Sequence, residues 1–381
     1  MRGEAQLAAP RLGLPVGNAR PIIFLAIVTP CVEFLTGSTS AIAVLTDPAS
    51  AVLFVLVTLP GYILPVLLIR EAIVVWRKGV PSLLALGIAY GAVNEGLLAK
   101  TYFSVNPLSP VLGPDGGVGR WIGVNWPWVT GITLFHMVVS MSVPVVLGFL
   151  LFPETRQTRF LTDRTIRWFV IYLGAVILGI LAIQSLFSPT FRGLLPLMML
   201  PAAIVGTGIY LARRFPRPNP NRTLGPRFSR PLVLTLGSMV FFIVVFFPII
   251  QFFPFPFTPL TFLSQEFYRS GEFAGVIATV YPWVLTAFAI RFFASRSLAE
   301  NQLAAITTGA MILPLATAIS IHDLPQGDWA AAGVYVGSIV LAWRRLQPGR
   351  ADAAPTSGRE SARPQSGNPP TPEETSPIPD K

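Results

Sequence analysis

Long apolar stretches alternate with short polar and basic stretches along most of the chain. A helix needs about 20 apolar residues to cross the hydrocarbon core of a bilayer, and most of these stretches approach that length. The pattern therefore predicts an all-α protein, a polytopic transmembrane helical bundle of about ten spans. Nine spans are the alternative, because the last stretch has only about 15 residues. The predicted spans are residues 21–45, 49–69, 81–102, 124–152, 168–187, 194–212, 231–253, 273–293, 303–320 and 329–343.

The positive charges fall on one side of this arrangement. When the spans are threaded back and forth across a bilayer, 24 of the 28 Lys and Arg residues lie on the same side. Because short loops rich in Lys and Arg stay in the cytoplasm, both termini are predicted to be cytoplasmic. Residues 1–20 would form a cytoplasmic N-terminal segment and residues 21–343 the transmembrane helical domain. Residues 344–381 contain few apolar side chains and are expected to form a disordered cytoplasmic tail.

Composition agrees with a membrane location. The chain is 52% hydrophobic and 12% charged, whereas an ordinary soluble domain is about 25% charged. The net charge of +10 does not indicate nucleic-acid binding, because the cations are spread over several loops and form no single patch. We expect a multi-pass protein of the cell membrane with membrane lipids as partners. The single cysteine, Cys31, excludes an intramolecular disulfide and a cysteine-based metal cluster, and no cofactor or metal is predicted.

Ionisable residues at membrane depth are the candidates for function, because they are costly there. Glu33, Glu95 and His136 lie within the first, third and fourth predicted spans. At 1.5 Å per residue, Glu33 and His136 are each about 18 Å from the end of their helix, near the midplane. Ser140 shares a helix face with His136, and Asn94 precedes Glu95. We therefore predict a polar pocket between these spans, with Glu33, Asn94, Glu95, His136 and Ser140 as substrate-binding residues and an ion or small molecule as substrate.

Each candidate also has a purely structural interpretation. The two glutamates could accept hydrogen bonds from Ser, Thr or Asn on neighbouring helices and so lock the bundle. His136 could bond to a local backbone carbonyl. Lys100 is close enough to the outer surface to extend its amine into the lipid head groups. Arg70 and Glu71, at the cytoplasmic end of the second span, are expected to act as an interfacial anchor.

Several short motifs in the first 155 residues are similar to those of a known family. They are Glu33-Phe34-Leu35-Thr36-Gly37-Ser38-Thr39, Leu68-Ile69-Arg70-Glu71, Trp76-Arg77-Lys78-Gly79, Ala89-Tyr90-Gly91 with Asn94-Glu95-Gly96-Leu97 and Lys100, Gly123-Val124-Asn125-Trp126, Phe135-His136 and Leu151-Phe152-Pro153. Over residues 28–155 the chain resembles a family of uncharacterised prokaryotic multi-pass membrane proteins. The resemblance implies a membrane location and a shared polar site, but no reaction. That family usually has two consecutive glutamates in the third span, whereas this chain has Asn94 and Glu95, which weakens any mechanism that needs a carboxylate pair.

Two activities and one structural role remain open from the sequence. The favoured one is a carrier or binding protein for an ion or a small, lipid-like molecule, with the Glu and His residues as a proton-sensitive site. The alternative is an intramembrane hydrolase similar to the prenyl-protease-like family, with Glu95 and His136 catalytic and Glu95 as the general base. That family's pattern has a second glutamate and a further histidine. Here Asn94 replaces the glutamate, and the other histidine, His322, is predicted in an external loop. The third hypothesis is that the chain is a structural membrane protein without an active site.

Overall fold

The computed structural model describes residues 19–35, 41–103, 119–187, 193–224, 230–250, 272–320 and 326–347. The described residues up to Leu346 form one compact unit. The predicted N-terminal segment, except for its last two residues, lies outside the described residues. So do His322 and the predicted tail beyond Gln347.

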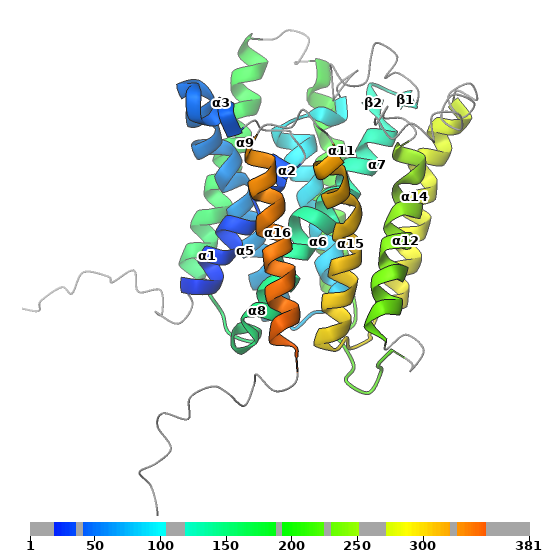
Figure 1. Ribbon diagram of the computed structural model, residues 1–381. Helices are drawn as coiled ribbons and strands as arrows, with labels where there is room; N and C mark the ends of the chain where they lie inside the picture. Colours follow the sequence, from blue (N-terminus) through cyan, green and yellow to red (C-terminus); the bar gives the residue numbers. More distant parts are fainter. Residues whose placement is uncertain are drawn as a thin grey trace, which may run out of the picture. The chain divides into compact units, whose positions relative to one another are not determined.

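The described chain is mostly helical (Figure 1). The α-helices are α1 (Ala19–Val28), α2 (Cys31–Leu35), α3 (Ala41–Thr46), α4 (Pro48–Leu53), α5 (Leu59–Trp76), α6 (Val80–Gly91), α7 (Trp126–Phe135), α8 (Val143–Leu151), α9 (Asp163–Phe187), α11 (Met199–Arg214), α12 (Pro231–Ile250), α14 (Glu272–Phe293), α15 (Glu300–Ser320) and α16 (Gln326–Arg345). The π-helical segments η2 (Phe54–Thr58), η3 (Ala92–Leu98) and η5 (His136–Ser142) continue α4, α6 and α7. Short 3₁₀ turns are η4 (Thr101–Phe103), η6 (Pro153–Thr155) and η7 (Leu195–Met198).

One small exception to the all-α prediction precedes α7. The strands β1 (Arg120–Trp121) and β2 (Val124–Asn125) pair in an antiparallel hairpin. Its two turn residues, Ile122 and Gly123, both have positive φ, which suits the tight turn of a two-residue hairpin. The Asn125 side chain then accepts a hydrogen bond from the Trp128 amide over 3.2 Å and caps α7. The hairpin thus fixes where α7 begins.

Six helices among the described residues are long and apolar enough to cross a membrane. They are Pro48–Trp76, Val80–Leu98, Trp126–Leu151, Asp163–Phe187, Leu195–Arg214 and Glu272–Phe293, and a shorter apolar helix covers Pro231–Phe246. These seven helices coincide with the second to eighth spans predicted from the sequence. The protein is therefore a helical protein with several helices capable of spanning a membrane. The total of ten spans and the cytoplasmic termini stay predictions.

The first predicted span, residues 21–45, differs from the structure because it is not one continuous helix. The helix α1 ends at Val28, and α2 starts at Cys31 after a tight turn. In this turn the amide of Glu33 bonds to the carbonyl of Pro30 over 3.1 Å, three residues back and not four. Pro30 has no amide hydrogen to continue the α1 ladder, which explains the break. The break leaves Glu33 on a separate short helix.

The helix α6 packs closely against η5 and α11. A Cβ atom on Gly87 would lie 2.7 Å from the Met137 carbonyl oxygen, and one on Gly91 would lie 3.0 Å from Thr133 Cα. Small residues are what allow two membrane helices to approach this closely. This contact sets the distance between α6–η3 and α7–η5, the two helices that carry Glu95 and His136.

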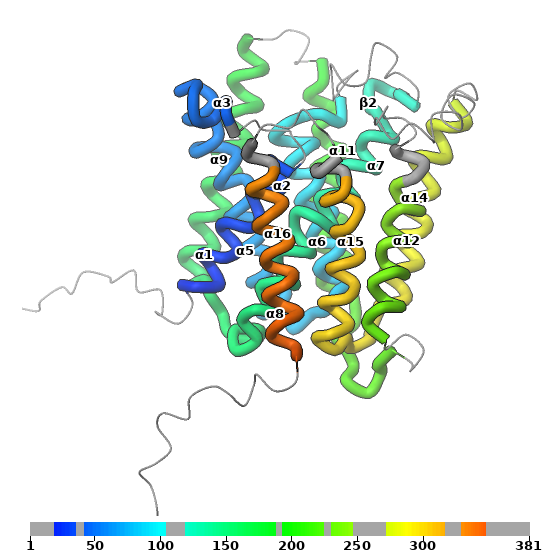
Figure 2. Tube along the Cα trace, in the orientation of Figure 1, coloured from blue at the N-terminus to red at the C-terminus, as the bar shows by residue number. Residues whose placement is uncertain are grey.

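The beginning and the end of the helical region meet. Figure 2 shows the blue N-terminal helices beside the orange helix α16, and α2 and α16 pack against each other. On its other side α16 packs against α15, which in turn packs along α12. The short helix α2, with Glu33, thus packs against α16.

Candidate functional site

A buried polar cluster lies where α6 and α7 pass into their π-helical segments. Glu95 on η3 and His136 on η5 contact each other, with 2.9 Å between Glu95 Oε1 and His136 Nε2. Only 8% of Glu95 and 3% of His136 is exposed. The other imidazole nitrogen, Nδ1, lies 2.7 Å from Ser140 Oγ, one turn further along η5. The two helices thus form a continuous polar chain from carboxylate through imidazole to hydroxyl.

Asn94 completes the surroundings of the imidazole. Its Nδ2 atom lies 3.2 Å from His136 Nε2, 3.2 Å from Glu95 Oε1 and 3.4 Å from the Tyr62 hydroxyl. An amide NH₂ group only donates, so Nε2 needs a lone pair to accept from Asn94 and a proton to donate to the Glu95 carboxylate. Nε2 therefore has a partner in either protonation state. The Ser140 hydroxyl can likewise donate to Nδ1 or accept from it.

The second oxygen of Glu95 is held from beyond the end of the π-helix. The Thr101 hydroxyl donates to Glu95 Oε2, and Trp128 Nε1 donates to Thr101 Oγ1 over 2.8 Å. Lys100, with a φ of 60°, turns the chain so that Thr101 faces back to the carboxylate. Lys100 itself is buried and donates to Gln184 of α9. The expectation that its amine extends into the lipid head groups is therefore wrong.

Three aromatic rings surround His136. The Tyr90 ring meets the imidazole edge-on, with 5.5 Å between centroids and an interplanar angle of 85°. The rings of Tyr62 and Phe135 lie 6.2 Å and 5.8 Å from it. Contacts of this kind fix the orientation of the imidazole. Tyr62 and Tyr90, from α5 and α6, are also 5.7 Å apart and form one wall of the cluster.

Glu33 joins the cluster through these tyrosines. Its half-buried carboxylate hydrogen-bonds with Tyr62 and lies within electrostatic range of Tyr90. Tyr62 in turn lies against the Asn94 amide. The structure therefore brings all five predicted residues into one region. Four of them form a chain of direct contacts, and Glu33 is connected to these four through Tyr62. The four in direct contact are Asn94, Glu95, His136 and Ser140.

Proline explains two of the three π-helical segments. Pro144 follows η5 by two residues, and Pro60 follows η2 by two residues. A proline ring inside an α-helix clashes with the carbonyl four residues earlier and cannot donate to it. The wider π turn relieves this clash, and the Leu56 carbonyl accepts a hydrogen bond from the Tyr172 hydroxyl of α9 over 2.6 Å. Pro144 thus shapes the segment that carries His136 and Ser140.

Three buried hydroxyl groups in or near this region lack a partner within the described part of the chain. They are Thr29 Oγ1, in the turn before α2, the Tyr90 hydroxyl on α6 and the Tyr335 hydroxyl on α16. Tyr335 lies within electrostatic range of Tyr90 and of Cys31. An unpaired buried hydroxyl is uncommon and calls for an explanation such as a bound molecule or water. Among the described residues, no group of three or more His, Cys, Asp and Glu side chains is arranged to hold a metal ion.

A second buried polar cluster surrounds Glu71 on α5. Arg70 and Glu71 are each 2% exposed, and Arg70 Nη1 lies 3.2 Å from Glu71 Oε2. The Arg70 guanidinium stacks 3.4 Å above the Phe160 ring centroid and donates to the Thr155 carbonyl. The pair is buried under the segment that joins α8 to α9. The expectation of an interfacial anchor is therefore wrong for these two side chains.

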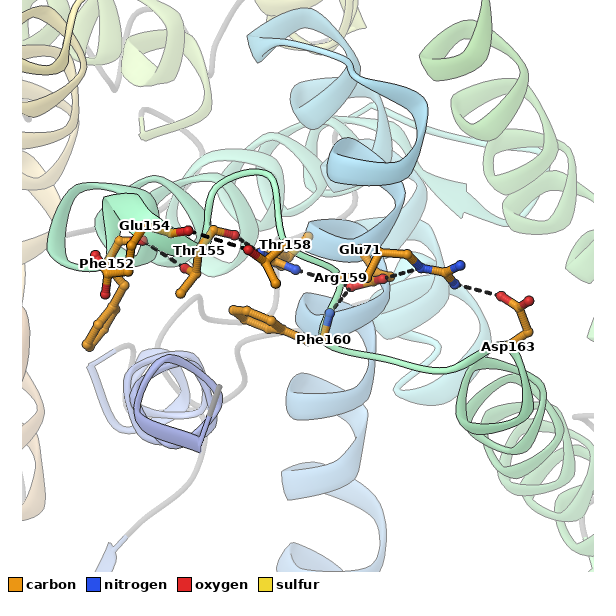
Figure 3. Close-up of polar contacts among 9 residues, drawn as sticks. Glu71, Phe152, Glu154, Thr155, Thr158, Arg159, Phe160 and Asp163 are labelled. Carbon is orange, nitrogen blue, oxygen red and sulfur yellow. Dashed lines mark hydrogen bonds and ion pairs between the residues drawn. The ribbon is translucent and has the colours of Figure 1, made fainter. Parts of the chain in front are cut away.

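The segment between α8 and α9 is shaped to cover Glu71 (Figure 3). Arg159 bridges two carboxylates, with Nε 3.1 Å from Glu71 Oε1 and Nη2 2.6 Å from Asp163 Oδ1. The hydrogen bond to Asp163, and to a smaller extent the one to Glu71, raises the pKa of Arg159 above its ordinary value. The Phe160 amide donates to Glu71 Oε2 over 3.0 Å. Cations and an amide surround this carboxylate, so the arrangement is that of a structural lock.

A family model described as an uncharacterized membrane protein family matches residues 22–356 of the chain. The match covers both polar clusters and all helices of the described chain except the first residues of α1. No curated protein and no solved structure matches the chain.

Proposed function

The chain belongs to an uncharacterized membrane protein family, and from its buried polar site we propose that it is a carrier or binding protein for a small cation that exchanges a proton at Glu95 and His136. The observation that carries the proposal is the 2.9 Å contact between a carboxylate and an imidazole, both buried among apolar helices. Such groups are costly at membrane depth and commonly mark ion or proton pathways.

The surroundings of His136 suit a group that gains and loses a proton. When Nε2 carries the proton it donates to Glu95, and when Glu95 carries it the carboxyl group donates to Nε2. Asn94 and Ser140 adjust by rotating or exchanging donor and acceptor roles. A proton can therefore move within the pair without leaving a buried polar atom unpaired.

A positively charged cargo fits the acidic side of the cluster. Two carboxylates, Glu33 and Glu95, both interact electrostatically with Tyr62 and Tyr90. Phenol and carboxylate oxygens are hard ligands of the kind that small cations prefer. The buried Tyr335 hydroxyl, without a partner in the described chain, offers a further acceptor near Tyr90. We infer that Glu33 and these hydroxyl groups supply the oxygen ligands of the cargo.

The π-helical segments support a site that changes shape. Glu95 and His136 each sit on such a segment, and mid-helix π turns are frequent at functional sites. In η3 the amide of Ala99 bonds to the Asn94 carbonyl over 2.7 Å, five residues back. Returning either segment to α-helical pairing would rotate its side chains relative to the other helix. Interrupted helices of this kind line the sites of many transporters.

The hydrolase alternative has weaker support. Asn94 and His136 lie against Glu95 Oε1, and Thr101 donates to Oε2, so three of the about four lone-pair positions of the carboxylate are taken. A general base needs a free lone pair directed at the water that it activates, and only Oε2 has one left. The position before Glu95 is Asn94, so the chain has no paired glutamate there to hold such a water.

The proposal is tested in proteoliposomes that contain the purified protein and an internal pH-sensitive dye. Inward gradients of Na⁺, K⁺ and a small amine are applied one at a time. At least one gradient should move protons outward in the wild type. The Glu95→Gln variant keeps the size and most hydrogen bonds of the side chain but loses its proton exchange, so the proton movement should disappear.

The matched control is Glu272→Gln, the same chemical change at an exposed residue at the start of α14. This variant should retain the proton movement of the wild type. Proton movement that persists in Glu95→Gln, or no proton movement with any of the three cations, would contradict the proposed function.

A further inference from the structure

A large cavity lies on the opposite side of η5 from the Glu95–His136 pair. It has a volume of about 1280 Å³, and Met137 and Ser142 of η5 belong to its lining. Small-molecule sites commonly measure about 300–1,000 Å³, so this cavity exceeds the size of an ordinary metabolite pocket. Its walls come mainly from α6, α8, α12, α14 and α15, and most of its lining side chains are apolar. A long apolar molecule is therefore the chemical class that fits its interior.

One end of the cavity is positively charged. Arg222, Arg291 and Arg296 line it there, and the described residues that line the cavity include neither Asp nor Glu. The Arg291 side chain is exposed. A cavity with three guanidinium groups and no carboxylate in its lining attracts an anion. The distribution of Lys and Arg assigns this end to the cytoplasmic side, where anionic lipid head groups are concentrated.

The arginines are held by a specific backbone arrangement. The segment after α11 pairs with the segment after α14: the Asn219 amide donates to the Ser295 carbonyl over 2.9 Å, and the Ser297 amide donates to the Arg222 carbonyl over 2.9 Å. Arg222 Nη1 also lies 3.2 Å from Ser295 Oγ. Arg296 stacks over Phe292 with 4.1 Å to the ring centroid. Two segments far apart in sequence thus place guanidinium groups at the same mouth.

We propose that this cavity binds one anionic lipid, with its phosphate between the three arginines and its acyl chains along η5, α12 and α14. Arginine forms paired hydrogen bonds with phosphate oxygens. The apolar side chains of the cavity walls would contact the acyl chains. The proposal does not rest on the proposed cation transport, because neither Glu95 nor His136 lines the cavity.

Native mass spectrometry of the full-length protein in detergent tests this proposal. The probes are dioleoylphosphatidylglycerol, dioleoylphosphatidylcholine and glycerol 3-phosphate, the last as a phosphate head group without chains. We expect one phosphatidylglycerol to bind with saturation, and the other two to bind at least about tenfold more weakly because each lacks either the net charge or the chains.

Two pairs of variants distinguish lipid binding in the cavity from lipid binding elsewhere on the protein. Gly237 lines the cavity on α12, and a Cβ there would meet no atom within 4 Å, so Gly237→Leu starts a larger side chain in open space at the cavity wall. A Cβ at Gly174 on α9 would also meet no atom within 4 Å, and Gly174 lies outside the lining, which makes Gly174→Leu the control. Gly237→Leu should weaken phosphatidylglycerol binding by about tenfold, and Gly174→Leu should leave it unchanged.

A second pair of variants tests the positively charged end of the cavity. The double variant Arg291→Gln with Arg296→Gln should weaken phosphatidylglycerol binding by about tenfold. Arg164→Gln with Arg167→Gln removes the same charge from the start of α9 and should have no effect. Glu95→Gln should also bind the lipid normally, so a failure of the transport proposal is distinguishable from a failure of this one.

Three results would overturn the lipid site. Equal binding of phosphatidylcholine would indicate ordinary bilayer lipid between the helices. Equal binding of glycerol 3-phosphate would indicate an anion site that does not use the apolar walls. Unchanged phosphatidylglycerol binding in Gly237→Leu would place the lipid elsewhere on the protein.

Discussion

Two buried carboxylates of this chain have opposite surroundings. Glu71 accepts hydrogen bonds from two guanidinium groups and the Phe160 amide, none of which loses a proton under ordinary conditions. Glu95 accepts from the Thr101 hydroxyl, the Asn94 amide and an imidazole, of which the imidazole readily gains and loses a proton. The partners of Glu71 stabilise a permanent negative charge, whereas the partners of Glu95 are compatible with both a charged and a neutral carboxyl group. This difference supports the proposal that Glu71 is structural and that Glu95 exchanges a proton.

Replacing Glu71 by Leu should destabilise the protein strongly, because Arg70 would be left as a buried charge without its partner. The expected loss in the free energy of unfolding is about 3–5 kcal/mol. Adding Arg70→Met removes the orphaned charge and should recover part of that loss. Reversible unfolding in mixed micelles measures both values.

The control for this pair is Asp163→Asn, which removes the exposed partner of Arg159 and should leave the free energy of unfolding almost unchanged. A double variant that is less stable than Glu71→Leu alone would show that Arg70 and Glu71 do not act as a pair.

At the scale of helices, close packing and π turns together bring the site residues into contact. Gly87 and Gly91 let α6 approach α7 and η5 until backbone atoms touch. The π turns η3 and η5 then direct Glu95 and His136 toward each other. Pro144 favours the π turn in η5 because an α-helical turn there would clash with its ring. The contact between carboxylate and imidazole therefore depends on residues that have no polar chemistry of their own.

Gly87→Ala should destabilise the protein and disturb the site, because the added methyl group would lie 2.7 Å from the Met137 carbonyl oxygen. Overpacking of this kind costs about 1–3 kcal/mol. Gly174→Ala on α9 meets no neighbouring atom and should be neutral or slightly stabilising. Thermal unfolding of both variants in the same detergent gives the comparison, and equal stability of the two would contradict the packing argument.

The part of the site visible in the sequence is the part that follows from helix periodicity. His136 and Ser140 lie one turn apart, and Asn94 precedes Glu95, so their proximity within each helix was predictable. Tyr62 and Thr101 come from other elements, and their contacts depend on helix packing and on the turn at Lys100. Neither lies in a pattern that periodicity detects.

The buried Arg70–Glu71 pair was missed for a similar reason. Its position at the end of a predicted span favoured an exposed anchor, but the segment from Thr155 to Phe160 folds back over it. The first helix also differs, because hydropathy alone does not register the break at Pro30. The positions of the later helices were predictable, since each follows from the length of an apolar stretch.

At the scale of the whole molecule, positive charge is distributed unequally between the two sides of the predicted membrane arrangement. The Lys and Arg residues cluster in segments that the predicted topology places on one side, and the arginine-lined mouth of the cavity belongs to that side. The predicted topology places the Glu95–His136 pair at membrane depth. A cation site at depth and a lipid site at the cytoplasmic end would therefore share η5 as a common wall.

The topology predicts the behaviour of reporter fusions. Green fluorescent protein fused after Lys381 should fluoresce in a bacterial host, and alkaline phosphatase at the same position should be inactive, because both termini are predicted in the cytoplasm. A phosphatase fused in the loop after Lys100 should be active and serves as the control. An active phosphatase at the C-terminus would contradict the predicted cytoplasmic C-terminus.

Nitrogen-15 NMR of the imidazole in bilayers tests proton exchange at Glu95 and His136 most directly. The chain has only two histidines, so the variant His322→Gln with labelled histidine reports on His136 alone. We predict that its two ring-nitrogen signals move between the neutral and the protonated imidazole as pH falls, and that Glu95→Gln shifts the pH at which they do so. A His136 signal that stays in one neutral form at every pH where the protein remains folded would contradict the account.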